Sequence, residues 1–242
     1  MADSVAQVSA SIDALERQFD IIAHNMANAS TVGFKRRCNN FTQAIAAQAA
    51  GPEGVTDAAP AQGPVDFSQG TLVQTDRTLD VALYGKGFFV IESPEGPLYT
   101  RHGIFQTNAN GQIVDTTGRL VAGTAGPLLV PPGVDVSELH VDSTGRVSAG
   151  TTALGQFEIV EFGDREAQLL PVGLNCFRAP TDARPVAATS VSVRQGYEEA
   201  SNVKIIDELV NMITVSRLYE ANMKLMTVNR DTSNSAISVA MG

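Results

Sequence analysis

Residues 21–37 read IIAHNMANASTVGFKRR and mark the point where an amphipathic helix gives way to chain of a different character. Met26 is the last member of an apolar repeat, and the polar residues His24, Asn25 and Asn28 lie around it. Side chains three or four residues apart lie on the same side of a helix, so these three polar residues are predicted to form one face. The small residues that follow predict the end of the helix.

The apolar repeat has alternating steps of three and four residues, which is typical of a helix in a coiled coil. Its members near the N-terminus are Val5, Val8, Ile12, Leu15, Phe19, Ile22 and Met26. The same spacing recurs near the C-terminus at Ile205, Leu209, Met212, Ser216, Tyr219, Met223 and Met226. A second helix from about residue 203 to about residue 236 would be roughly 50 Å long, which is longer than a compact domain needs.

The chain between these predicted helices lacks the apolar repeat of three and four residues. Residues 51–64, GPEGVTDAAPAQGP, have no apolar period and predict an exposed loop or linker. From Leu72 to Val193 the chain consists of short β-like runs, including LDVALYG, GFFVIES and GQFEIVEF, separated by turn residues. No helical pattern separates the runs, so an all-β domain is expected rather than a parallel α/β sheet.

Two turns in this middle region are near copies of each other. They read Asp-Thr-Thr-Gly-Arg at 115–119 and Asp-Ser-Thr-Gly-Arg at 142–146. In both, Asp is expected to open the turn through its side chain, and Gly to supply a positive φ angle. Both stretches therefore predict hairpins.

These patterns predict an α+β fold in which N- and C-terminal heptad helices pair as a coiled coil and flank an all-β middle domain. The predicted boundaries are 1–35 for the N-terminal helix, 36–70 for an extended linker, 71–198 for the β-rich outer domain and 199–242 for the C-terminal helix. The pattern allows two arrangements of the helices: they pack within one chain, or they face other subunits. The length of the second helix favours packing against other subunits, because a helix longer than its own domain leaves part of its apolar stripe exposed to water unless another molecule covers it.

Composition and charge exclude several classes of protein. The 242 residues include 26 acidic and 17 basic side chains, and the basic ones are scattered except at 35–37, which argues against a nucleic-acid binder. No basic residue precedes Arg17 and no long apolar run is present, so neither a cleaved signal peptide nor a membrane-embedded helix is expected. Cys38 and Cys176 are far apart and form no C-x-x-C motif, so no disulfide framework or zinc site is predicted.

The sequence offers no coherent set of catalytic residues. His24, His102 and His140 lie far apart, with no second ligand at a metal-binding spacing. Gly85 and Gly87 in YGKGFF have no third glycine at the offset of a dinucleotide-binding loop, and close packing between strands explains them better. We therefore expect no enzymatic activity, no metal and no cofactor.

Four blocks of the chain resemble a known family. They are IIAHNMANASTVGFKR at 21–36, QGTLVQTDRTLDVALYGKGFFVI at 69–91, YTRHGIFQTNANGQIVDTTGRLVAG at 99–123 and GYEEASNVKIIDELVNMITVSRLYEANMK at 196–224. In this order they are similar to the axial rod and hook proteins of the bacterial flagellum, and most closely to the rod proteins. His24 and His102 depart from the pattern, which has Asn at the first position and Asp or Asn at the second.

The resemblance implies a structural subunit of the flagellar basal-body rod that self-assembles through its terminal helices into the hollow drive shaft for motility. The implied partners are copies of itself in a helical homo-oligomer, other rod and hook-junction proteins, the surrounding ring proteins and the flagellar type III export apparatus. The implied location is the periplasm-spanning rod, reached without a cleaved signal peptide. Whether the subunit belongs to the proximal or the distal rod is left open by the motifs.

The residues expected at subunit interfaces combine the heptad positions with the polar face. They are Val8, Ile12, Leu15, Phe19, Ile22, Asn25, Met26, Asn28, Ile205, Leu209, Met212, Tyr219 and Met223. The polar face is expected to bond to neighbouring subunits or to the facing C-terminal helix. Gly33 is expected to turn the chain and Phe34 to begin the segment that leads outward.

Two other functions fit parts of the pattern. A secreted adhesin or another surface protein with coiled-coil ends would also have terminal heptads. A β-rich enzyme or carbohydrate-binding module with helical additions would also have the β-rich middle. Self-assembly into rods would argue against the adhesin, and binding of a glycan by residues 70–195 would argue for the module.

Overall fold

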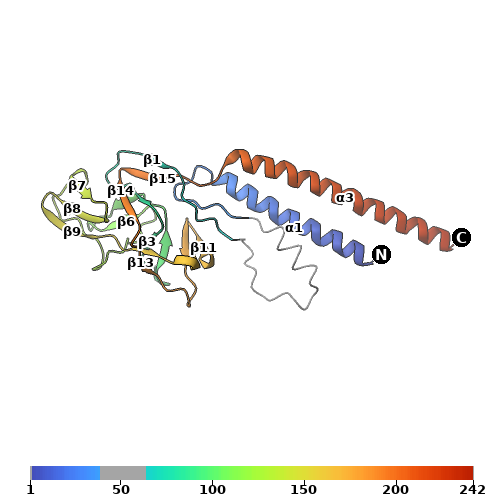
Figure 1. Cartoon of the computed structure of the whole chain (residues 1–242), viewed down its shortest axis with the longest axis horizontal. Helices are drawn as coiled ribbons and strands as arrows, with labels where there is room; N and C mark the ends of the chain where they lie inside the picture. Colours follow the sequence, from blue (N-terminus) through green and yellow to red (C-terminus); the bar gives the residue numbers. More distant parts are fainter. Residues whose placement is uncertain (1, 39–63, 242) are drawn as a thin grey trace. The chain divides into compact units, whose positions relative to one another are not determined.

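The structure is a computed structural model that describes residues 2–38 and 64–241 (Figure 1). It divides into two compact units. We call the first the helical unit, and it consists of the described residues within Met1–Ala27, Arg37–Val65 and Val203–Gly242. The second, the β unit, consists of Asn28–Arg36 and Asp66–Asn202. Of the predicted 36–70 linker, residues 39–63 lie outside the described residues, so that part stays a prediction.

The helical unit contains helix α1, Ala2–Ala27, and helix α3, Ile205–Met241. The two helices run alongside each other in Figure 1. Leu15 and Ile22 of α1 form a buried apolar cluster with Val215 of α3. Four partly buried side chains pack around this cluster: Phe19, Met26, Met212 and Tyr219.

The predicted pairing of the helices as a heptad coiled coil is wrong. The structure has a mostly β middle, with one helix before it and one after it, and the helices meet in a short cluster. Three predicted heptad positions on α3 are exposed, namely Ile205, Leu209 and Met223, whereas Glu208 and Val215 are buried. Apolar residues lie on several sides of α3, so their spacing did not identify the buried side. A buried hydrogen bond between Asn25 and Glu208 turns Glu208 inward, which places the adjacent Leu209 outward.

The β unit contains short strands and two 3₁₀ helices. The elements are β1 Leu72–Gln74, β2 Val81–Tyr84, β3 Phe88–Ile91, β4 Leu98–Thr100, β5 Phe105–Thr107, β6 Ile113–Asp115, η1 Val136–Glu138, β7 Leu139–Val141, β8 Arg146–Ala149, β9 Thr152–Gln156, β10 Ile159–Glu161, η2 Gly163–Gln168, β11 Leu170–Gly173, β12 Cys176–Arg178, β13 Val186–Ala187, β14 Ser192–Gln195 and β15 Tyr197–Glu199. The prediction of a β-rich middle region is therefore confirmed. All the described strand pairs are antiparallel. Short connections join the hairpin pairs, such as β3–β4 and β7–β8, and allow this arrangement.

The largest sheet has six strands in the order β11-β12-β4-β3-β10-β13. Its strand β3 reads FFVI and all four side chains are buried, so other side chains cover both faces of the sheet at this strand. Smaller pairs surround this sheet, including β1 with β15 and β2 with β14. In the β1–β15 pair Leu72 lies opposite Glu199, which joins the start of the middle region to its end.

The core of the β unit is aromatic. The rings of Phe89 and Phe105 meet edge to face at 5.1 Å, and Phe105 stacks on Phe157 at 5.5 Å. All three rings are buried, together with Val81 and Val147. Complete burial of such a side chain contributes about 1.5–3 kcal/mol, so this core is sufficient to fix the short strands around it.

Both predicted Asp-Gly turns are confirmed. Asp115 Oδ1 accepts a hydrogen bond from the backbone N–H of Thr117 at 2.8 Å, and Asp142 Oδ1 accepts one from Thr144 at 2.8 Å. Gly118 has a φ of +85°, as the turn requires. The second turn joins β7 to β8 in a hairpin.

Candidate functional site

A buried ion cluster lies in the β unit where three segments meet. Lys35 Nζ lies 2.6 Å from Glu199 Oε1, and Arg101 Nη1 lies 3.3 Å from Glu199 Oε2. The exposed fractions of these side chains are 1% for Lys35, 0% for Glu199 and 4% for Arg101. Two cations therefore share one carboxylate with almost no access to water.

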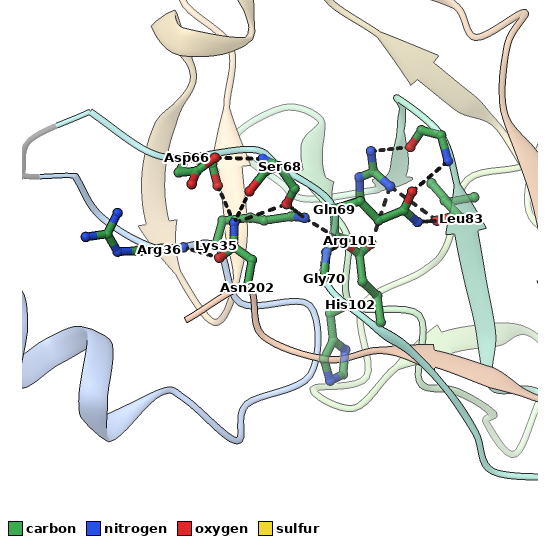
Figure 2. A network of polar contacts seen from close by, with 12 residues as sticks. Lys35, Arg36, Asp66, Ser68, Gln69, Gly70, Leu83, Arg101, His102 and Asn202 are labelled. Atoms are coloured by element: carbon green, nitrogen blue, oxygen red, sulfur yellow. Dashed lines mark hydrogen bonds and ion pairs between the residues drawn. The ribbon is translucent and has the colours of Figure 1, made fainter. Parts of the chain in front are cut away.

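Backbone groups complete the cluster (Figure 2). Lys35 Nζ donates to the carbonyl of Ser68 at 2.8 Å, and the N–H of Gly70 donates to Glu199 Oε1 at 2.9 Å. Arg101 Nη2 donates to the carbonyl of Gly85 at 2.7 Å. The charges thus bind the backbone of neighbouring segments as well as each other, which is how buried ions are compensated in proteins.

Burial sets the protonation behaviour of the two cations. Loss of hydration lowers the pKa of Lys35, and the Glu199 carboxylate acts in the opposite direction. Loss of hydration likewise lowers the pKa of Arg101, again against the effect of Glu199. The carboxylate is therefore what keeps two protonated side chains in a dry environment, and its removal would leave both without compensation.

The cluster ties together the two places where the chain enters and leaves the β unit. After α1, the N–H of Gly33 donates to the carbonyl of Glu199 at 2.7 Å, and the N–H of Arg36 donates to Asn202 Oδ1 at 2.7 Å. Asn202 Nδ2 also donates to the carbonyl of Asp66 at 2.8 Å. The segment that follows α1 and the segment that precedes α3 are thus held to one another inside the β unit.

Gly33 is required by this close approach. Its φ is +69°, a conformation that residues with a side chain rarely adopt. A Cβ atom at this position would lie 2.5 Å from the backbone N of His102. The predicted turn at Gly33 therefore lies directly against the backbone that follows β4, and the next residue, Phe34, is buried.

Asn25 fixes a second polar arrangement, which lies in the helical unit. Its Nδ2 donates to the carbonyl of Arg37 at 2.9 Å and to Glu208 Oε1 at 3.2 Å, and its Oδ1 accepts from the N–H of Arg37 at 2.9 Å. The side chain therefore bonds to α3 and to the chain that follows the turn. Asn28, the other predicted asparagine, accepts from Thr31 Oγ1 at 3.2 Å within the turn.

The structure separates the predicted interface residues into buried or half-buried ones and exposed ones. Those that contact the facing helix are Leu15, Phe19, Ile22, Asn25, Met26, Met212 and Tyr219. Val8, Ile12 and Asn28 are half-buried. Three are exposed on α3: Ile205, Leu209 and Met223. Only the exposed group is available to another molecule without rearrangement of the helical unit.

The comparisons with known proteins agree with the motifs. The family described as "Flagellar hook protein FlgE/F/G D1 domain" matches residues 82–149, and "Flagellar basal body rod FlgEFG protein C-terminal" matches residues 194–239. The flagellar basal-body rod protein FlgG of Agrobacterium fabrum is 34% identical over 252 residues, which cover 93% of this chain and 94% of the relative. This chain belongs to the flagellar basal-body rod protein family.

Other members of the rod protein family show similar agreement. FlgF of Caulobacter vibrioides is 32% identical and covers 92% of this chain and 91% of its own length. FlgF of Salmonella typhimurium is 31% identical and covers 91% of this chain and 92% of its own length. These relatives are named as rod proteins, and neither matching family is described as catalytic.

The ion cluster of this rod-family chain was missed by the reasoning from sequence. Lys35, Arg101 and Glu199 lie in three different blocks of the rod-family motif, VGFKRR, YTRHG and GYEEASNV. Each charged residue in such a block resembles an ordinary surface residue, because its partner is distant in the sequence: 164 positions for Lys35 and Glu199, and 98 for Arg101 and Glu199. No signal in the sequence singled out these three residues, because VGFKRR carries three basic residues and GYEEASNV carries two acidic ones.

The described part of this rod-family chain lacks both a metal-binding cluster and a membrane-spanning helix. Within residues 2–38 and 64–241, no group of three or more His, Cys, Asp and Glu side chains is placed to hold a metal ion. Over the same ranges no helix combines the length and apolarity needed to cross a membrane. The ion cluster is closed to solvent, so what the arrangement can do is hold backbone segments in place.

Proposed function

We propose that this chain is a self-assembling structural subunit of the flagellar basal-body rod, the drive shaft for motility. The rod function of its relatives supports a structural role in the flagellar basal body. Within that role, we infer that the subunit transmits torque passively, through the strength of its packing. The buried ion cluster supports this inference, because it ties the chain connections within the β unit by charge-assisted bonds.

The observation that carries the proposal is an apolar face on α3 that remains in water. We call it the outward face, and it consists of Ile206, Val210, Ile213 and Val228, with exposed fractions of 71%, 57%, 56% and 60%. The predicted interface residues Ile205, Leu209 and Met223 are exposed beside it. Ile206, Val210 and Ile213 recur at helical spacing and form an apolar stripe of about two turns, and Val228 lies on the same side of the helix beyond Arg217 and Lys224.

A stripe of this kind is unfavourable in water. Each large aliphatic side chain gains about 1.5–3 kcal/mol when it becomes fully buried, so a neighbouring subunit that covered the outward face would be bound strongly. A face that meets a different face of the next copy generates an open helical array when the rotation between copies does not close into a ring. We infer that the outward face makes such a contact in the rod.

The same proposal includes the expected partners and location. Besides its own copies, the subunit would contact other rod and hook-junction proteins and the surrounding ring proteins. It would reach the periplasm-spanning rod through the flagellar type III export apparatus, without a cleaved signal peptide. Each of these contacts is a prediction from the family, and the outward face of α3 is the surface that we assign to the first of them.

A substitution on the outward face tests the proposal. Val210→Asp places a carboxylate in the stripe, and Val210→Leu is the matched control that keeps it apolar. In a strain that lacks the native gene, Val210→Leu should support swimming in soft agar, and Val210→Asp should not, although equal amounts of folded subunit are present. Recovery of intact basal bodies and full motility with Val210→Asp would contradict the proposal.

A further inference from the structure

A small pocket lies on the β unit between four strands. It has a volume of about 330 Å³ and is lined by Gln69, Gly70, Leu72, Tyr84, Arg194 and Tyr197. These residues come from β1, β2, β14 and β15 and from the segment that precedes β1. The pocket adjoins the buried ion cluster at Gly70, whose N–H donates to Glu199, and no residue of α3 lines it.

Part of the lining is held rigidly. Gln69 Nε2 donates to the carbonyl of Leu83 at 2.7 Å, and Gln69 Oε1 accepts from the N–H of Gly85 at 3.1 Å, so both ends of its amide are fixed. Tyr197 lies opposite Gln74 in the β1–β15 pair, and its hydroxyl lies 3.4 Å from Gln74 Oε1. The walls are therefore preformed, and a ligand would not have to order them.

Two other lining residues are free to act on a ligand. Arg194 lies opposite Ala82 in the β2–β14 pair, and Tyr84 lies two positions after Ala82, so Arg194 and Tyr84 project from the same side of this ribbon. Both side chains are exposed, and neither forms an ion pair or a side-chain hydrogen bond with any residue that the structure describes. Arg101, Arg119 and Arg178, in contrast, each pair with a carboxylate of the β unit.

The chemistry of the lining indicates the kind of group that would fill the pocket. A guanidinium presents a planar set of donors that matches a carboxylate, and no acidic residue lines the pocket to occupy it. The two tyrosines and Leu72 offer apolar surface directly beside that cation. Tyrosine and arginine are also the residues that most often dominate the energy of protein–protein contacts.

We propose that this pocket binds an acidic peptide segment of a partner protein. The carboxylate of a Glu or Asp side chain bonds to Arg194, and a neighbouring apolar side chain packs against Leu72 and the tyrosine rings. Local charge complementarity favours this ligand, because Arg194 is a cation with no acidic residue beside it in the lining, although the net charge of −9 on the whole chain acts in the opposite direction. A free phosphate would satisfy the guanidinium but would leave the apolar walls uncovered.

Intrinsic fluorescence gives a direct test in the full chain. The protein has no tryptophan and four tyrosines, and two of the four line the pocket. The probes are N-acetyl-Glu-Leu-amide and its uncharged match N-acetyl-Gln-Leu-amide, neither of which fluoresces. The Glu probe should change the tyrosine fluorescence saturably, and the Gln probe should bind about tenfold or more weakly, because a charged hydrogen bond is lost.

Two variants test whether the fluorescence change arises from binding in the pocket. Arg194→Gln should weaken binding of the Glu probe about tenfold or more, while Arg184→Gln, at an exposed arginine outside the pocket, should leave it unchanged. The proposal is overturned if the Glu probe gives no saturable change, if the two probes bind equally, or if Arg194→Gln binds like the unmodified chain. Tighter saturation of the same signal by inorganic phosphate would also overturn it. None of these outcomes depends on rod assembly.

Discussion

Lys35 Nζ lies 2.6 Å from Glu199 Oε1, although 164 positions separate the two residues in the sequence. One residue follows the first helix and the other precedes the last, so this pair fixes where the chain enters and leaves the β unit. A buried ion pair of this kind adds little stability relative to apolar residues of the same volume, but the loss of one partner is costly. The Lys35–Glu199 pair therefore acts mainly by holding the entering and leaving segments of the β unit together, and adds little to the net stability.

Glu199→Gln tests this contribution. The substitution keeps the shape of the side chain but leaves Lys35 and Arg101 buried without a counter-charge, so the free energy of unfolding should fall by about 3–5 kcal/mol. Urea unfolding followed by tyrosine fluorescence would measure it. The half-buried neighbour Glu198 is the control, and Glu198→Gln should change the free energy by less than about 0.5 kcal/mol. Equal effects of the two substitutions would contradict the role of the cluster.

The sequence predicted the β-rich middle and both Asp-Gly turns, because these depend on signals that lie within a few residues. It could not predict the cluster, because the charges of Lys35, Arg101 and Glu199 come together only when distant segments meet. The buried side of α3 was also misjudged. Leu209 was predicted to lie at a heptad position, whereas the buried bond of Glu208 to Asn25 places Glu208 inside and Leu209 outside.

Gly33→Ala should destabilise the β unit by more than about 2 kcal/mol, because it combines an unfavourable positive φ with a clash against the backbone of His102. Gly118→Ala is the matched control, since Gly118 also has a positive φ but has open space where the Cβ atom would lie. It should cost only about 1 kcal/mol. The difference between the urea midpoints of Gly33→Ala and Gly118→Ala measures the cost of the clash with the backbone of His102. Equal midpoints would show that this backbone moves aside without cost.

Leu15 and Leu209 should respond differently to the same substitution. Leu15 is buried against α3, so Leu15→Asp should destabilise the helical unit by about 3 kcal/mol or more. Leu209 is exposed, so Leu209→Asp should change its stability by less than about 1 kcal/mol. Thermal unfolding monitored by circular dichroism of the helices would show this. Equal losses would mean that Leu209 is buried within the chain after all.

His102 should make the stability of the β unit depend on pH. Burial lowers the pKa of His102 below its ordinary value of 6.5, against the opposing effect of Asp115 and Asp80. Between the lowered pKa and 6.5 the unfolded chain binds a proton that the folded chain does not, so stability falls as the pH falls through this range.

His102→Asn should therefore reduce the loss of stability between about pH 7.5 and about pH 5.5, as measured by urea midpoints at the two values. The exposed His140 provides the control, because His140→Asn should leave the difference between the midpoints unchanged. If the two urea midpoints of His102→Asn differ as much as those of the unmodified chain, another group causes the pH dependence.

The central claim is that neighbouring subunits cover the outward face of α3 in the assembled rod. The most direct measurement is the reactivity of a single thiol, Val210→Cys, in a chain whose native cysteines are replaced by serine at Cys38 and Cys176. A maleimide should label this thiol rapidly in the purified subunit, as rapidly as in urea, but hardly at all in isolated basal bodies. Equal labelling of the subunit and the basal bodies would show that the outward face stays in water in the rod.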